Sequence, residues 1–202
     1  MEVPKIQLSS AEAELMNNAA LILTKNSVLN KMKQLLESVQ VMQMNMVEQR
    51  RLQHNEPFII SPKISRGENY MGLPYLILDY PRASTADSLF FIRTMFWWGN
   101  FFSSTLHMSG RFKETFLSGI MAAYPQLRDL FIGINEDPWI HHFEATNYVR
   151  IGNISRQEFE SYCSRHSHLK LGACWPLDDW RHASVFLFEH WKFLLTNCGL
   201  IT

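Results

Sequence analysis

The first quarter of the chain carries apolar residues every three or four positions, which is the spacing of one helix face. Ser9 followed by Glu12 forms a capping-box pattern that opens a helix. A polar break at residues 24–26 separates this helix from a second one that runs to about residue 52. The second helix has one apolar stripe, made of Val28, Met32, Leu35, Val39, Met42 and Met46. We therefore expect residues 10–53 to form a helical hairpin, an integral subdomain of the fold.

Proline and glycine become frequent after residue 54, and short β-prone runs lie between them. The better run, Tyr75–Tyr80, predicts a strand, and Phe58–Ile60 is a weaker candidate. Pro74 suits only the start of a strand or an edge position, because it has no N–H for the ladder. Residues 61–69 are polar, and we expect a connecting loop there.

The strongest local pattern spans residues 89–108. Two runs rich in β-prone residues flank Gly99-Asn100, which accept the positive φ of a tight turn. A two-residue turn would place Ile92 opposite His107, and a slip of one residue would move every side chain of one strand to the other face. Both faces of this hairpin are too apolar for free exposure to water, so we expect it at the centre of a sheet.

Weaker patterns in the second half complete the expected set of elements. Helices are expected at residues 111–123, 155–166 and from 178 or 179 to before 199, and strands at 147–151 and 168–174. The order of helices first, strands next and mixed elements last favours an α+β fold over a doubly wound parallel sheet. We expect a central, mostly antiparallel sheet with the C-terminal helices packed on it. No linker divides the chain, so residues 1–202 are expected to form one domain, with the sheet and its packing helices in 54–202.

The charge balance excludes several classes of partner. Basic and acidic residues number 19 each, and no basic stripe or tail occurs. Nucleic-acid binding depends on Lys and Arg that neutralise phosphates, so we expect no nucleic-acid partner. The charges also give no reason to expect a membrane surface as partner, and no apolar run is long enough to span a bilayer. Aromatic residues make up 13% of the chain, which predicts a dense aromatic core or an aromatic pocket.

Three cysteines, Cys163, Cys174 and Cys198, are scattered along the chain without a CxxC spacing. They fit small buried side chains in a reducing compartment better than a disulfide framework. Residues 1–5 lack the basic-then-apolar order of a signal peptide. Both observations lead us to expect a cytoplasmic protein.

Motifs of common enzymes are missing from the sequence. It contains no GxGxxG, P-loop, HExxH or GxSxG pattern, so we expect no cofactor, and whether the protein is an enzyme stays open. The candidate functional residues are instead polar or aromatic side chains in and beside apolar runs. They are Asp79, Tyr80, Arg82, Arg93, Trp97 and His107.

Arg93 lies in the middle of an almost wholly apolar strand, where a charge needs a partner. One interpretation is a structural ion pair, or an edge position from which the guanidinium reaches water. The other is a fixed bidentate contact to a carboxylate or phosphate of a ligand. His107, at the end of the next strand, is either a hydrogen-bonded core residue or a general base or ligand contact.

Asp79, Tyr80 and Arg82 close the preceding strand. Polar groups at the end of a strand either cap a turn or line a site. The strand register decides whether Asp79 shares a face with Arg93 or with His107, and the sequence leaves that register open.

Two groups of histidines raise the question of a metal. His141 and His142 are followed by Glu144, and His166 and His168 are spaced to share one strand face. Adjacent side chains on a strand point in different directions, and neither spacing supplies the third ligand that zinc needs. We therefore expect no metal at these four histidines.

Two hypotheses of function follow. The first is an intracellular binding or interaction protein, with an aromatic-rich pocket for a small molecule around residues 89–108 or a homodimer contact through the helix 27–52. The second is a small hydrolase or transferase in which Arg93 holds an anionic substrate and His107 with Asp79 performs acid–base chemistry. The missing motifs favour the first. Convergence of these three side chains on one open pocket would favour the second.

Overall fold

The computed structural model describes residues 6–201, and the segment in which we expected no signal peptide lies outside that range. Its N-terminal helices are α1 (Ser10–Asn17) and α2 (Ala19–Gln49). The expected capping box is present, because the side chains of Ser9 and Glu12 each accept a hydrogen bond from the other residue's backbone N–H.

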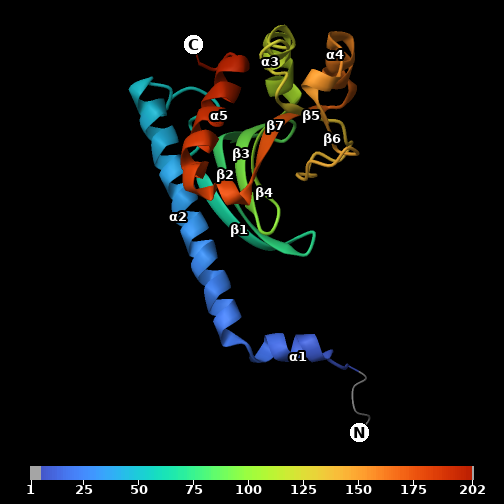
Figure 1. Cartoon of the computed structure of the whole chain (residues 1–202). Coiled ribbons are helices and arrows are strands. Elements are labelled where there is room, and N and C mark those ends of the chain that lie inside the picture. The colour runs from blue at the N-terminus through green and yellow to red at the C-terminus, as the bar shows by residue number, and fades with distance from the viewer. Residues whose placement is uncertain (1–5, 202) are drawn as a thin grey trace.

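The boundary between the two helices differs from the expectation. It falls at Asn18, whose side chain accepts a hydrogen bond from the Leu21 N–H and so caps α2. The polar residues 24–26 lie inside α2, where they are tolerated because Thr24 and Asn26 are exposed and Lys25 forms an ion pair with Glu68. α1 leaves the far end of α2 and does not run back along it, so the two helices do not form a hairpin (Figure 1).

The apolar stripe of α2 packs against the body of the protein. The buried residues of α2 are Met32, Val39 and Met46 of the stripe, Leu29, Leu36 and Val47 beside it, and the polar Gln43. Val41 and Met44 lie outside this stripe and are exposed. The 3.6-residue period therefore identified the packing face of α2 correctly. The side of the helix that points away from this face is exposed.

Seven strands form one sheet in the order β1-β2-β3-β4-β7-β5-β6, and every neighbouring pair is antiparallel. The strands are β1 (Lys63–Tyr70), β2 (Leu73–Ser84), β3 (Leu89–Trp97), β4 (Phe101–Ser109), β5 (Phe131–Gly133), β6 (Tyr148–Arg150) and β7 (His168–Pro176). The remaining helices are α3 (Gly110–Ala122), α4 (Arg156–Arg165) and α5 (Ala183–Asn197), with a 3-10 turn before α5 at Leu177–His182. The expected α+β fold is confirmed.

Two assignments near the start of the sheet are wrong. The segment expected as a loop, 61–69, contains most of β1, and Phe58–Ile60 is a bend instead of a strand. β1 is an edge strand that pairs only with β2, and most of its side chains reach solvent. A polar edge strand lacks the apolar alternation that identifies half-buried strands, which explains the error.

The hairpin at Gly99-Asn100 is confirmed, but its turn takes three residues, because Trp98 also lies outside both strands. Gly99 has φ of +72°, as the tight turn requires. The extra residue shifts the register by one position, so that Phe91 and not Ile92 faces His107. Every side chain of β4 therefore points to the face opposite to the one that a two-residue turn predicts.

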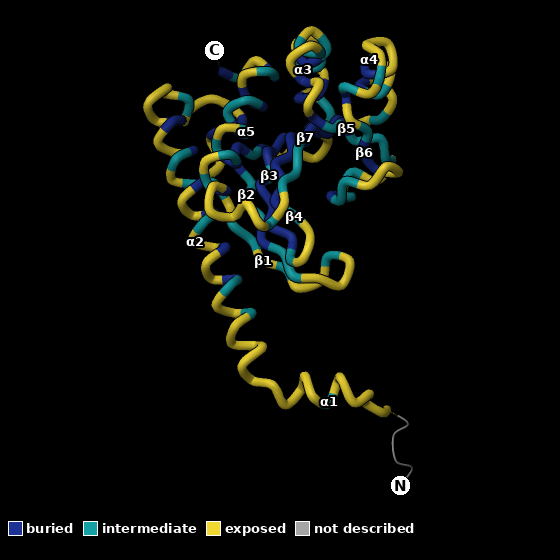
Figure 2. Tube along the Cα trace, viewed as in Figure 1, coloured by how far each residue is buried: buried dark blue, intermediate teal, exposed yellow. Residues whose placement is uncertain are grey.

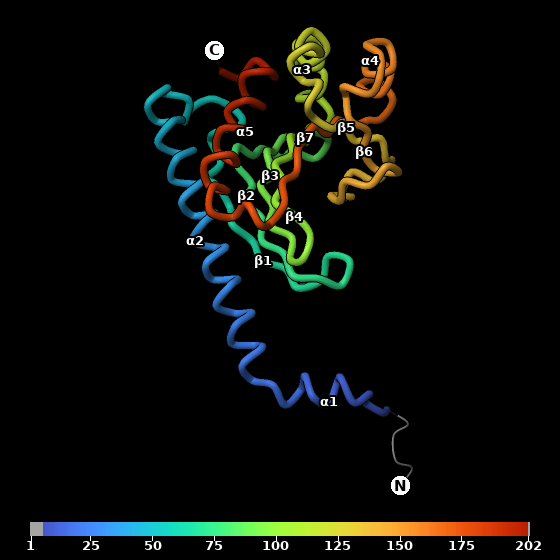
Figure 3. The backbone as a smooth tube through the Cα atoms, viewed as in Figure 1, coloured from blue at the N-terminus to red at the C-terminus, as the bar shows by residue number. Residues whose placement is uncertain are grey.

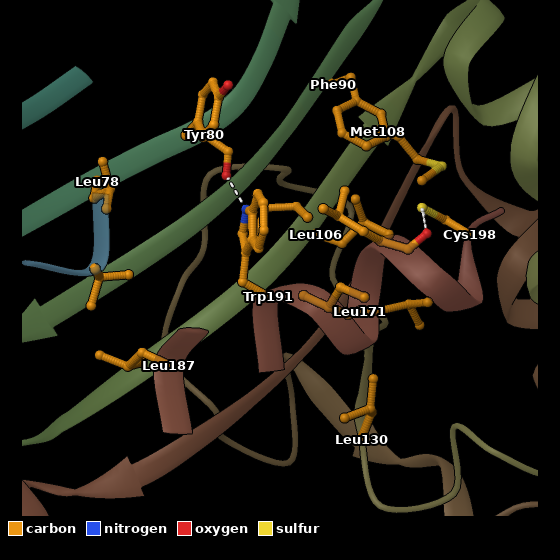
Figure 4. Packing of buried hydrophobic residues seen from close by; sticks show 14 of the residues in the cluster. Leu78, Tyr80, Phe90, Leu106, Met108, Leu130, Leu171, Leu187, Trp191 and Cys198 are labelled. Carbon is orange, nitrogen blue, oxygen red and sulfur yellow. Dashed lines mark hydrogen bonds between the residues drawn. The ribbon is translucent and has the colours of Figure 1, made fainter. Parts of the chain in front are cut away.

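The helices that follow α1 cover one face of the sheet, and the apolar core lies between these helices and the sheet (Figures 1 and 4). Trp191 of α5 is fully buried there, stacks on the Tyr80 ring and donates a hydrogen bond to the Tyr80 carbonyl at 2.6 Å (Figure 4). α3 joins the same face through the edge contact between Phe112 and Phe90. Among residues 6–201, no helix is long and apolar enough to cross a bilayer.

Candidate functional site

The second face of the sheet carries a cluster of polar side chains under the segment 134–147, which joins β5 to β6. The Tyr70 hydroxyl holds this segment by accepting a hydrogen bond from the His141 N–H at 2.7 Å. Lys170 of β7 also holds it, because its amine donates to the Ile140 carbonyl. The sequence left this segment without an assignment, and it is the cover of the polar face.

Arg93 and Asp79 are direct neighbours in the register of β2 and β3, and their side chains form a bidentate ion pair. The Arg93 Nε and Nη2 atoms each donate to one Asp79 oxygen, both at 2.8 Å. A third donor, Nη1, lies 2.9 Å from Nε2 of His141. A guanidinium only donates, so His141 must accept there and carry its proton on Nδ1. These contacts occupy three of the five Arg93 donors.

His107 lies on this same face and is buried. Its ring makes edge contacts with Phe91 and with Trp139, whose indole stacks on Phe91 and is 53% exposed. Trp139 thus separates two small clefts. One, of about 190 Å³, is lined by Asp79, Arg82 and Arg93 among others, and the other, of about 210 Å³, contains His107. The register brings the three expected catalytic side chains to one face, but these two clefts divide them: Asp79 and Arg93 line one, and His107 lines the other.

Lys170 is a cation that the sequence reasoning missed. It pairs with His107 across β4 and β7, is buried, and lies 5.3 Å above the Tyr148 ring. It stands within a run of mainly apolar residues, the same signal that singled out Arg93. The strand 168–174 was recognised only weakly, and its one basic residue was therefore overlooked.

Burial controls the protonation of this cluster. It lowers the pKa of Lys170 to about 7, and the nearby Arg93 charge acts in the same direction. It lowers the pKa of His107 to about 3, with Lys170 as the next cause, and it holds the pKa of His141 well below its usual range. Both imidazoles are therefore neutral near pH 7, which agrees with His141 as an acceptor for Arg93.

Lys170 gives the protein a specific pH dependence. The unfolded lysine has a pKa near 10.5 and the folded one a pKa near 7, so between these values the unfolded chain binds one more proton. Stability rises with pH wherever the unfolded state binds more protons. The free energy of unfolding of the wild type, relative to that of Lys170→Met, is thus expected to rise as the pH goes from 7 to 10. Urea unfolding of both proteins across this range measures it, and a difference that stays constant with pH would contradict a neutral buried amine.

The other expected site residues make no hydrogen bond to Asp79, Arg93 or His107 among the contacts of the described residues. The Tyr80 side chain lies on the helix-covered face against Trp191. Arg82 donates from Nε to the Ser61 carbonyl at the rim of the smaller cleft. Trp97 is on the polar face but farther along β3, where its indole N–H donates to the Tyr70 carbonyl at 3.2 Å.

The histidines expected to bind no metal lie in two separate places. His141 and His142 belong to the covering segment and contact Arg93 and Tyr70, respectively. The rings of His166 and His168 stack with their centroids 5.5 Å apart, near the start of β7. The expectation that these side chains bind no metal stays a prediction.

A second candidate site lies on the helix-covered face, at the tip of the hairpin. It is a groove of about 460 Å³, and we call it the aromatic groove. Its lining comes from α2, the hairpin and the 3-10 turn before α5: Val28, Lys31, Met32, Phe96, Trp98, Gly99, Phe102, Leu177 and Trp180. Trp180 is 51% exposed, so its indole forms part of the rim. Trp98, in the turn of the hairpin, lies on this side, where its indole makes an edge contact with Phe96.

The aromatic groove differs in chemistry from the other concavities. A wider one, of about 580 Å³, lies between the end of α2 and α5, but Arg50, Glu189 and Lys192 line it. In the aromatic groove, Lys31 is the one charged residue of the lining. Small-molecule sites are typically concave, largely apolar and between about 300 and 1,000 Å³, and the aromatic groove meets these three conditions.

Comparison with known proteins adds no family to this description: no protein-family model, curated protein or solved structure matches the chain.

Proposed function

We propose that this is a binding protein, and that the aromatic groove takes an apolar group of a ligand or partner. The observation that carries the proposal is the lining of the groove, in which Phe96, Trp98 and Phe102 of the hairpin face the apolar residues of α2. Aromatic side chains provide large contact areas at low cost in conformational entropy, as binding sites require. Lys31 at the groove would pair with an acidic group on the bound molecule.

The alternative, a hydrolase or transferase for an anionic substrate, has less support. Asp79 and His141 occupy three of the five Arg93 donors, and Asp79 takes the pair that would bind a substrate carboxylate in a bidentate manner. His107 lies in a different cleft from Asp79, so the two do not flank one reacting group. A general base must lie within hydrogen-bond reach of the proton that it removes. A cytoplasmic setting fits either function, because all three cysteines are free thiols.

The proposal is tested with an apolar reporter, at a protein concentration at which sedimentation equilibrium shows a monomer. 1-Anilinonaphthalene-8-sulfonate combines aromatic rings for the groove with a sulfonate for Lys31, and its fluorescence rises on burial. We expect one saturable site on the wild type. Val28→Arg, which puts a charge into the lining, is expected to weaken reporter binding at least about tenfold, the effect of about 1.4 kcal/mol.

The matched control is Val41→Arg, on the exposed face of the same helix. This variant should bind the reporter as the wild type does, and circular dichroism should show that both variants are folded. Equal binding by the wild type and Val28→Arg would overturn the assignment of the aromatic groove.

A further inference from the structure

We propose that the aromatic groove is filled by the N-terminal arm of a second copy of this chain, in a two-fold dimer whose two arms are exchanged. The arm consists of α1 and the first turns of α2, residues 10–24. This inference depends on the proposed function of the groove, and it names the partner. We expected a homodimer contact through the helix 27–52. The dimer proposed here uses only the first turn of that segment, residues 28–32, and adds the N-terminal arm.

The arm exposes apolar side chains that its own chain leaves uncovered. α1 has no buried residue, and the arm stands away from the body of the protein with its surface exposed along its whole length (Figures 2 and 3). Five large apolar residues are between 45% and 70% exposed: Leu15, Met16, Leu21, Ile22 and Leu23. Apolar patches of this kind on a protein surface mark interaction sites.

The continuity of α2 excludes the arm of the same chain as the occupant. One uninterrupted helix connects the end of the arm to Val28 and Met32, which form one wall of the groove. A helix rises about 1.5 Å per residue, so Asn18 lies about 15 Å from Val28 along the axis. The helix therefore holds residues 19–24 away from the groove of their own chain, and α1, which has no buried residue, does not fill that groove either.

A two-fold axis places the two parts together. When the projecting ends of two α2 helices run antiparallel, the α1 of each chain arrives beside residues 28–32 of the other. Each chain then offers one arm and one groove, so the same contact forms twice and the assembly closes as a dimer. A helix that lays apolar residues into an apolar groove is a common mode of recognition.

The charges of the two surfaces are complementary. The arm, residues 10–24, contains two charged residues, Glu12 and Glu14, and both are acidic. Lys31 is the charged residue of the groove. The arm of one chain thus brings carboxylates to the ammonium group of the other. This attraction determines the orientation of the arm in the groove more than it increases the affinity.

The experiment measures the mass of the full-length protein in solution by sedimentation equilibrium. We expect a dimer for the wild type and monomers for the arm variant Met16→Glu/Leu23→Glu and the groove variant Val28→Arg. The control Val41→Glu/Met44→Glu changes two exposed apolar residues on the outer face of α2 and should stay dimeric. A monomeric wild type at concentrations of hundreds of micromolar, or a dimeric arm variant, would overturn the exchange of arms.

Mixing the two monomeric variants gives a sharper result. The arm variant keeps an intact groove and the groove variant keeps an intact arm, so one of the two contacts can form between them. We expect a heterodimer in the mixture, weaker than the wild-type dimer. Two monomers that stay separate when mixed would contradict a reciprocal contact between arm and groove.

The reporter separates failure of this inference from failure of the proposed function. Suppose that the wild type is monomeric and that the arm variant binds 1-anilinonaphthalene-8-sulfonate in the groove. The groove is then a binding site, but a second copy of the chain is not its occupant. An arm variant that shows no binding in the groove removes both.

Discussion

Replacing Trp191 by Ala is expected to lower the free energy of unfolding by about 4 kcal/mol, the central value for a large aromatic residue removed from a core. The side chain has no exposed surface and packs between the sheet and α5 (Figure 4). Its loss leaves a cavity that the neighbouring side chains fill only partly. It also removes the hydrogen-bond donor of the Tyr80 carbonyl, which is buried.

Two further variants show how much of this loss of stability comes from the buried indole. Trp191→Phe keeps a six-membered aromatic ring but removes the N–H and the pyrrole part of the indole, so it leaves a smaller cavity and should cost less than Trp191→Ala. Val185→Ala removes a 58% exposed side chain near the start of the same helix and should change stability by no more than about 0.5 kcal/mol. Urea unfolding followed by far-ultraviolet circular dichroism measures all three. A cost below 1 kcal/mol for Trp191→Ala would mean that α5 does not pack on the sheet as described.

Replacing Asp79 by Asn is expected to cost about 3 kcal/mol, because it leaves the Arg93 charge without its carboxylate. The two side chains are 16% and 14% exposed, respectively, so the effect lies at the lower end of the range for buried pairs. Arg93→Met should be destabilising for the same reason, since it strands the Asp79 carboxylate. Thermal and urea unfolding of both variants measure this cost.

The double variant Asp79→Leu/Arg93→Met tests the origin of the cost. It removes both charges, so it should be more stable than the sum of the two single changes predicts. The ion pair Arg150–Asp129 offers a comparison at the surface, where Asp129→Asn should cost less than about 1 kcal/mol. Strictly additive losses at residues 79 and 93 would show that the pair contributes nothing through its own interaction.

Periodicity predicted the elements whose burial follows a simple pattern. The stripe on α2, the strand 75–80, the hairpin around Gly99 and the capped helix after Ser155 all lie where expected. Each combines an apolar repeat with a local cap or turn residue. The break at Asn18 was missed, because helix-forming residues continue past it to residue 23 and the polar residues 24–26 are the more visible interruption. The edge strand β1 was missed because it lacks apolar alternation.

The candidate site was harder to predict, because it depends on register. A single added turn residue, Trp98, decides that His107 joins Arg93 and Asp79 on one face. The sequence contains no signal for the cover formed by 134–147, which has little regular structure and is held by Tyr70 and Lys170. The aromatic groove combines residues from three distant segments, and such a surface becomes visible only in the folded chain.

The most direct test of the central claim, that the aromatic groove binds the arm of a second copy, is photo-crosslinking from the rim of the groove. Trp180 is replaced in the full-length protein by p-benzoylphenylalanine, an aromatic residue that forms a covalent bond to its nearest neighbour on illumination. The account predicts a covalent dimer in which mass spectrometry locates the bond within residues 10–24 of the other chain. Illuminated protein that remains a monomer, or a covalent dimer joined outside the arm, would contradict it.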